Sequence, residues 1–103
     1  MKLYHGTDTE SAEAINNDGH IKAGHSYYGG ISGVALTPRF DVAVDFALSE
    51  GGDGVVFEVD VDENHLVADP ESENSESVDD VLNSGGSVYA CLEAVTPSAQ
   101  YVV

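Results

Sequence analysis

Acidic residues outnumber basic ones by nineteen to three in this chain of 103 residues, which leaves a formal charge of −16. The acids are spread along the whole sequence, so in dilute buffer they repel one another across a single small domain. At molar salt the screening length falls to roughly 3 Å, and the same surface becomes a soluble, hydrated one. The charge therefore predicts a protein of a halophilic organism or of its virus.

The charge also limits the partners. Binding to a nucleic-acid backbone needs clusters of Lys and Arg, and the basic residues are Lys2, Lys22 and Arg39 alone. We therefore expect no direct contact with phosphate backbones. An acidic inhibitor that mimics nucleic acid and blocks a basic partner is the alternative that the charge itself suggests.

Length and cysteine content set the organisation of the chain. At this length we expect one domain over residues 1–103, because two cores would each be too small to offset their conformational entropy. Cys91 is the single cysteine, which excludes an internal disulfide and predicts a buried, inert thiol. No apolar run approaches the 18 or so residues of a membrane span, so we expect no membrane association and a cytoplasmic location. The oligomeric state is left open.

Hydrophobic periodicity predicts an α+β fold with a mixed or antiparallel sheet and two short helices. The clearest strand is 54–61, where Glu58 and Asp60 alternate with apolar residues as in a sheet with one wet face. One helix is expected from the capping box at Thr7 to Gly19, and another from Pro38 to Gly51. Further short strands are expected at 2–5, 34–37, 65–68, 87–95 and 100–103, and one helical turn at 78–82.

The most informative local motif is Leu3-Tyr4-His5-Gly6-Thr7. A histidine that leaves a strand beside a glycine offers a ring nitrogen next to backbone that a ligand can approach closely. The other histidines, His20, His25 and His65, lack the paired spacing of a zinc site, so no metal is expected.

The order of motifs after this histidine resembles that of the diphtheria-toxin-like ADP-ribosyltransferases, in particular the poly(ADP-ribose) polymerase branch with its His-Tyr-Glu signature. The resemblance covers most of the chain and rests on short motifs. These are His5-Gly6, then Ile15 and Gly19, then Gly33-Val34-Ala35-Leu36-Thr37, then Ala43 and Phe46-Ala47, and finally Gln100-Tyr101-Val102-Val103.

The resemblance implies an ADP-ribosyltransferase-like split sheet and NAD as substrate. It implies that His5 holds a ribose hydroxyl, that the backbone of Gly6 clamps the nicotinamide amide, and that Phe46 stacks on the nicotinamide ring. The remaining residues implied to bind the cofactor flank this site: Thr7, Thr37, and the tyrosines of the expected donor loop, Tyr27 and Tyr28.

Two positions depart from the family pattern. Ala35 stands where the signature tyrosine ends the second strand, and Gln100 stands where the catalytic glutamate is expected. A neutral amide can orient a ribose but hardly offsets the positive charge that develops as the glycosidic bond breaks. Glu93 is a candidate replacement carboxylate, so the candidate catalytic residues are His5, Gln100 and Glu93.

The expected function is therefore transfer of one ADP-ribose unit from NAD to an unidentified acceptor. Relatives of the mono-transferring kind also lack the glutamate. The alternatives are a catalytically inactive module that binds NAD or ADP-ribose, and the acidic mimic, which predicts a continuous carboxylate stripe without a cleft beside His5 and Phe46.

Overall fold

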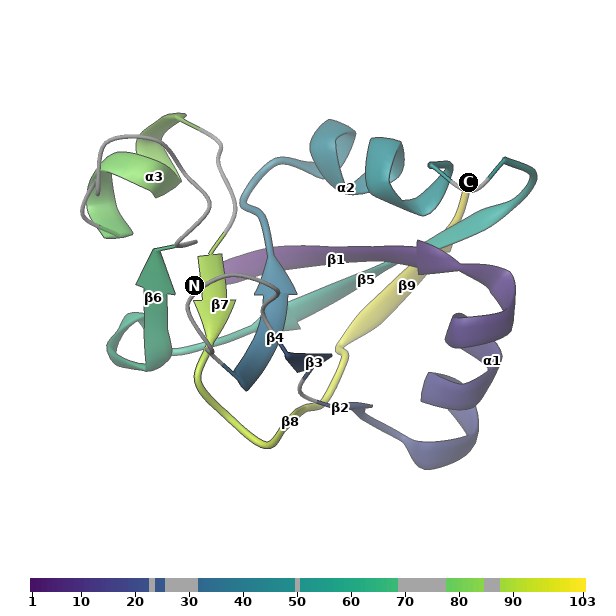
Figure 1. Cartoon of the computed structure of the whole chain (residues 1–103), viewed down its shortest axis with the longest axis horizontal. Helices are drawn as coiled ribbons and strands as arrows, with labels where there is room; N and C mark the ends of the chain where they lie inside the picture. The colour runs from purple at the N-terminus through teal and green to yellow at the C-terminus, as the bar shows by residue number, and fades with distance from the viewer. Residues whose placement is uncertain (23, 26–31, 50, 69–77, 85–87) are drawn as a thin grey trace.

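The computed structural model describes residues 1–22, 24–25, 32–49, 51–68, 78–84 and 88–103 (Figure 1). Every strand pair in these segments is antiparallel, which confirms the α+β class. The helices are α1 (Thr9–Asp18), α2 (Phe40–Ala47), α3 (Val78–Ser84) and the 3-10 turn η1 (Glu63–His65). The strands are β1 (Lys2–Asp8), β2 (Ile21–Lys22), β3 (Gly24–His25), β4 (Ser32–Leu36), β5 (Gly54–Asp60), β6 (Leu66–Ala68), β7 (Val88–Ala90), β8 (Ala94–Val95) and β9 (Ala99–Val102).

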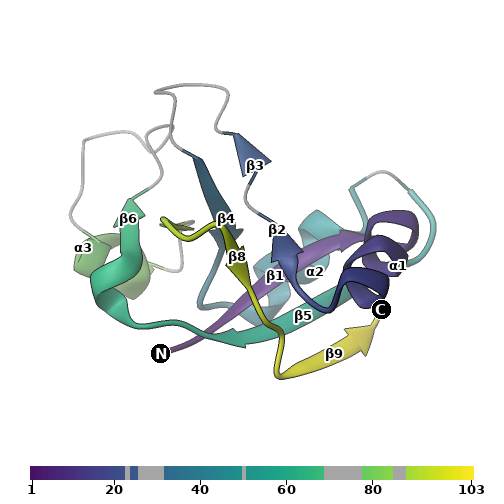
Figure 2. The same cartoon turned by 90° about the horizontal axis from the view of Figure 1, so that it is seen from below.

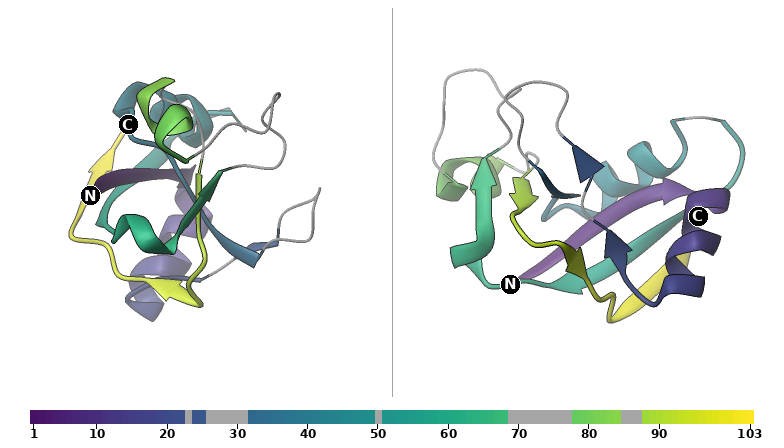
Figure 3. Two further views of the ribbon diagram at one scale, coloured as in Figure 1. Left: turned by 90° about the vertical axis from the view of Figure 1, so that its left-hand side faces the viewer. Right: turned by 60° about the horizontal axis from the view of Figure 1, so that its bottom comes forward.

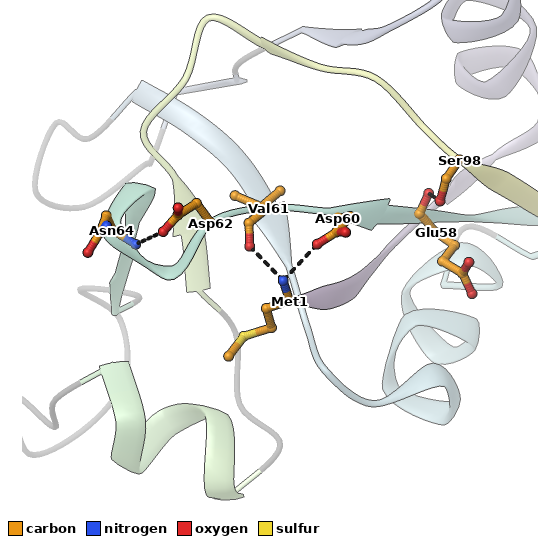
Figure 4. A network of polar contacts seen from close by, with 7 residues as sticks. All are labelled: Met1, Glu58, Asp60, Val61, Asp62, Asn64 and Ser98. Atoms are coloured by element: carbon orange, nitrogen blue, oxygen red, sulfur yellow. Dashed lines mark hydrogen bonds and ion pairs between the residues drawn. The ribbon is translucent and has the colours of Figure 1, made fainter.

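One sheet has the order β1-β5-β9, with α2 on one face and α1 on the other (Figure 1). Its central strand β5 pairs with β1 along its whole length. The amino terminus is fixed to the end of β5, because the ammonium group of Met1 donates to Asp60 Oδ1 at 2.7 Å and to the Val61 carbonyl at 3.1 Å (Figure 4). The start of β1 is therefore held to the end of β5 by both strand pairing and charge.

A second sheet has the order β3-β4-β7-β6, and the short pair β2-β8 lies beside it (Figure 2). Its strands run at a steep angle to those of the first sheet (Figures 1 and 3). The two sheets meet at one bridge, where Tyr4 and Thr37 exchange backbone hydrogen bonds of 2.8 and 2.9 Å. Beyond this bridge β1 and β4 diverge and no longer pair, so the two sheets are joined at one point and separate from there.

The main core lies between the two sheets and α1. Its largest fully buried side chains are Phe57, Leu3 and Leu36. A smaller cluster of Ala43, Ala47 and Val56 lies between α2 and the other face of the first sheet. Both faces of β5 are therefore covered over 54–57, and the expectation of one wet face holds only toward the end of that strand.

Helix α1 ends at the glycine predicted from the sequence, but it begins later than predicted. Gly19 ends the helix in the left-handed conformation, with φ of 81°, and its N–H donates to the Ile15 carbonyl. The N-cap is Asp8, whose Oδ1 accepts from the Ser11 N–H at 2.7 Å, and not Thr7. The reason is that β1 continues through Gly6 to Asp8 in register with β5.

The start of α2 also differs from the prediction. Pro38 precedes the helix, Arg39 is the N-cap, and Phe40 is the first helical residue. Thr37 is the last residue that pairs with β1, and its Oγ1 accepts from the Arg39 N–H at 3.3 Å. Pairing with the first sheet therefore delays the helix.

The predicted strand 87–95 is divided. A bend at 91–93 separates β7 from β8, because the Cys91 N–H donates to His65 and the Leu92 N–H donates to Ala90. After the bend the chain changes partner from β4 and β6 to β2.

The bend exposes Cys91, so the prediction of a buried thiol was wrong. His65, which was expected to start a strand, is instead the last residue of η1. The helical turn predicted at 78–82 extends to Ser84 and forms α3.

Candidate functional site

A hollow of about 410 Å³ opens where β1 and β4 part, in the range of ligand-binding cavities. His5 and Thr7 line it from β1, and Ala35 lines it from β4. The rest of its wall comes from α1, from the β2 region, from two further residues of β4 and from β7. These residues are Ser11, Ala14, Ile15, Asp18, His20, Ile21, Lys22, Gly33, Val34 and Tyr89.

His5 spans the split between the two sheets. Its Nδ1 lies 2.8 Å from the carbonyl oxygen of Ala35. A carbonyl only accepts, so Nδ1 carries the proton, and in the neutral ring Nε2 is left as an acceptor. Burial lowers the pKa of the imidazole, and the hydrogen bond to Ala35 opposes this only in part. At neutral pH the ring therefore presents a neutral acceptor at the wall of the hollow.

Gly6 presents unpaired backbone at the same split. Tyr4 directs its N–H and C=O to Thr37, and alternate residues of an antiparallel strand direct these groups to the same side. Gly6 is therefore the next residue of β1 whose N–H and C=O point away from β5, and at this position β4 no longer pairs with β1. Among the described residues neither its N–H nor its C=O has a hydrogen-bond partner. Within the described segments this edge therefore offers one donor and one acceptor, next to the hollow that the flanking residues His5 and Thr7 line and Gly6 itself does not.

The absence of a side chain at Gly6 also allows α2 to pack closely against β1. A Cβ at this position would collide with the Ala43 carbonyl of α2. The same holds at Gly54, where a Cβ would collide with the Ala47 carbonyl. Both glycines thus let α2 lie directly on the strands.

Two residues implied by the family resemblance lie away from the hollow in the described structure. Phe46 is 55% exposed on α2 and lines none of the described cavities. Thr37 is buried at the bridge between the sheets, and its Oγ1 accepts from the N–H of Arg39, the residue before α2. Tyr27 and Tyr28 lie outside the described residues, so the structure places neither.

Gln100 lies in the same row of the sheet as His5, with Phe57 between them. All three point toward α1. The Gln100 amide, however, is paired with the Asn16 amide through two hydrogen bonds of 3.0 and 3.1 Å. Gln100 lines two other cavities, and of the residues around the His5 hollow only Ile15 lines one of these as well.

Glu93 is exposed in the bend between β7 and β8, and not in a strand as expected. It does not line the His5 hollow. Among the described residues that line the hollow, the one carboxylate is Asp18, whose Oδ2 lies 3.3 Å from Lys22 Nζ.

The sequence analysis missed Tyr89 as a site residue. It stands directly opposite Ala35 in the register of β4 and β7, and it lines the hollow. The signal was an aromatic residue in a short apolar strand, which is equally typical of a core position. Only the strand pairing places it at the position facing the missing tyrosine.

The residues that the structure describes contain no group of side chains arranged to hold a metal ion. No helix among them is long and apolar enough to span a membrane. Comparison of the chain with the profiles of known families, with curated proteins and with solved structures finds no match.

Proposed function

We propose that the hollow beside His5 binds NAD and that the protein is an ADP-ribosyltransferase-like protein. The observation that supports the proposal is the split beyond the Tyr4–Thr37 bridge, where a cavity of about 410 Å³ is lined by His5 and Thr7 on either side of Gly6. The backbone N–H and C=O of Gly6 have no partner among the described residues. A carboxamide is a ligand that uses one donor and one acceptor together. The acidic mimic is supported less well, because it predicts no cleft beside His5.

Each part of the proposed ligand has a partner at this site. The Nε2 atom of His5 accepts a hydrogen bond from a ribose hydroxyl, and the backbone of Gly6 pairs with the carboxamide. Tyr89 offers an aromatic ring on the strand next to Ala35, which stands where the family has its signature tyrosine. Lys22 is a cation in the wall, and to bind the pyrophosphate it exchanges its exposed ion pair with Asp18 for the new contact.

The proposed reaction is transfer of a single ADP-ribose. The bond between nicotinamide and the ribose breaks, nicotinamide leaves, and a nucleophile of the acceptor forms the new bond and loses its proton. The positive charge that develops on the ribose is stabilised by a nearby carboxylate. In the part of the wall that the structure describes, Asp18 is the one carboxylate, and it is paired with Lys22.

This shortage of negative charge supports a second candidate, which is a module that binds NAD or ADP-ribose without turnover. Gln100 is neutral, and its amide is occupied by Asn16. The two candidates share the pocket and differ only in whether nicotinamide is released.

The proposed setting is the cytoplasm of a halophilic organism, or of such a host infected by a virus. A chain of charge −16 repels the pyrophosphate of NAD in dilute buffer, and salt screens this repulsion. We therefore expect the affinity for NAD to rise with salt concentration over the range in which the protein stays folded.

Titration calorimetry with NAD and with nicotinamide in molar potassium chloride tests binding. Binding is expected for the wild type and for His65→Ala, which removes an exposed histidine far from the hollow. His5→Ala is expected to weaken binding of NAD. Absence of heat at millimolar ligand in the wild type would overturn the proposal.

Release of nicotinamide separates the two candidates. A transferase releases nicotinamide in the presence of an acceptor, and His5→Ala slows this release. Equal rates in wild type and His5→Ala would remove His5 from the mechanism. NAD binding with no release by either protein would favour the binding module.

A further inference from the structure

The free edge of the first sheet adjoins a groove that the proposed NAD site does not use. Strand β9 is the last strand of the order β1-β5-β9, and α1 lies beside it (Figures 2 and 3). A cavity of about 520 Å³ lies between them. A second one, of about 190 Å³, continues past the Asn16–Gln100 pair toward Pro97 and Ser98.

The edge of β9 carries unpaired backbone groups. Val103 exchanges hydrogen bonds with Gly54, so Val103, Tyr101 and Ala99 direct their backbone toward β5. The alternate residues, Gln100 and Val102, direct theirs away from the sheet. In the described part of the chain these outward groups have no partner, and the Val102 side chain is 79% exposed. An edge of this kind is a template for another strand.

The helix side of the groove is acidic. Glu10 and Glu13 line it from α1, above a floor of Ala12, Val55 and Val102. Neither carboxylate has a basic partner in the described structure. The three basic side chains of the chain are all committed elsewhere, in the pairs Lys2–Glu58, Lys22–Asp18 and Arg39–Asp41. The charge that would complement this groove must therefore come from outside the molecule.

We propose that the groove between α1 and β9 takes an extended basic segment of a partner protein, which adds to the sheet as a fourth strand beside β9. Its backbone pairs with the outward groups of Gln100 and Val102. Because side chains of a strand alternate between faces, every second residue lies toward α1, where Lys or Arg meets Glu10 and Glu13. The intervening residues lie on the other face, beside the partly exposed ring of Tyr101, and are apolar.

Charge argues for a basic partner and against a second copy of this chain. Two β9 edges paired with one another would bring together two molecules of charge −16, and each would keep its own Glu10 and Glu13 without a counter-charge. A basic segment neutralises these groups on binding.

The test is fluorescence anisotropy with a short blocked peptide of alternating Lys and Val, at the lowest salt at which circular dichroism shows the protein folded. This peptide is expected to bind, and a peptide with Glu in place of Lys is not. Val102→Pro removes the outward N–H, which a proline on an edge strand can lack without disturbing the sheet. It is expected to abolish binding, whereas Val102→Thr, which keeps that N–H, binds.

The charges are tested with Glu10→Gln combined with Glu13→Gln. Loss of two exposed ion pairs is expected to weaken binding at least about threefold. Asp45→Asn combined with Glu63→Gln removes the same charge from exposed positions on α2 and η1, neither of which lines the groove, and serves as the matched control. Equal weakening by both double variants would overturn the proposed placement.

Amide hydrogen exchange locates the added strand. The peptide is expected to slow exchange at Gln100 and Val102, whose N–H groups point outward, more than at Tyr101, whose N–H already faces β5. Binding of the Lys-Val peptide is expected to weaken as salt rises, opposite to NAD, so the two proposals can fail separately. No peptide binding, together with self-association that Val102→Pro abolishes, would make a second copy the occupant and overturn the proposal.

Discussion

On the α2 side of the three-stranded sheet, helix backbone lies directly on strand backbone, and on the α1 side a large ring and several cavities lie between helix and strands. Gly6 and Gly54 make the first contact, with only Ala43, Ala47 and Val56 fully buried there. On the second side Phe57 fills the centre, and the hollows lie around it.

The difference shows how the strand pair β1–β5 packs closely against a helix on one face and leaves space on the other. Successive residues of β1 point to opposite faces, so Gly6 belongs to the closed side and His5 to the open side. The small residues leave no space for a ligand under α2. The bulk of Phe57 holds α1 away from the strands, which leaves space at both ends of the row from His5 to Gln100.

The largest effect is expected from Phe57→Ala. Removal of a fully buried ring should lower the free energy of unfolding by about 3–5 kcal/mol. Phe46→Ala, on the exposed side of α2, should change it by less than about 0.5 kcal/mol. Chemical denaturation in molar salt measures both. A similar small loss for the two variants would mean that α1 does not rest on Phe57.

Gly6→Ala tests the closed side. The added methyl group collides with the Ala43 carbonyl of α2, so we expect a loss of about 1–3 kcal/mol from overpacking. Gly19→Ala is the comparison, because it meets open space and costs only about 1 kcal/mol for its left-handed conformation. If Gly6→Ala were as stable as the wild type, α2 would not be in direct contact with β1.

Thr37→Val tests the junction at which the two sheets part. The change removes the oxygen that accepts from the Arg39 N–H at the start of α2, and a loss of about 1 kcal/mol is expected. Thr96→Val, at an exposed position, is the control. Equal thermal midpoints for the two variants would contradict a stabilising role for the hydrogen bond between Thr37 and Arg39.

The smallest effect is a pH dependence of stability that originates at His5. Its folded pKa lies below the unfolded value, so the unfolded chain binds the proton more readily. The contribution of His5 is therefore complete above the unfolded pKa of about 6.5 and is lost as pH falls through the folded value. Denaturation of wild type and His5→Asn at acidic and neutral pH should show a larger acid loss in the wild type. Parallel losses would contradict burial of the imidazole.

Several elements could be predicted because their signals are local. The alternation in β5 and the glycine stop of α1 depend only on neighbouring residues and on the conformation that glycine allows. The structure places His5 in the wall of a hollow, and its role there stays a prediction. The family roles given to Phe46, Gln100 and Glu93 are not tested by the comparisons and stay predictions.

Other features depended on partners distant in sequence. The continuation of β1 through Gly6 follows from pairing with β5, and the division of strand 87–95 follows from the hydrogen bond of Cys91 to His65. The Asn16–Gln100 pair joins residues 84 positions apart. No periodicity within either segment indicates such contacts.

By itself the sequence determined the class of fold, the surplus of negative charge and the helix stop at Gly19, because each is a property of composition or of a few adjacent residues. Only the tertiary structure decided that β1 and β4 part after one bridge and that Tyr89 pairs with Ala35 across the strands. It also decided that, in the segments it describes, the edge of β9 stays open beside two glutamates without a basic partner. Those features depend on strand register and on which chain segments lie next to one another, and the free energy that selects them comes from packing the whole core.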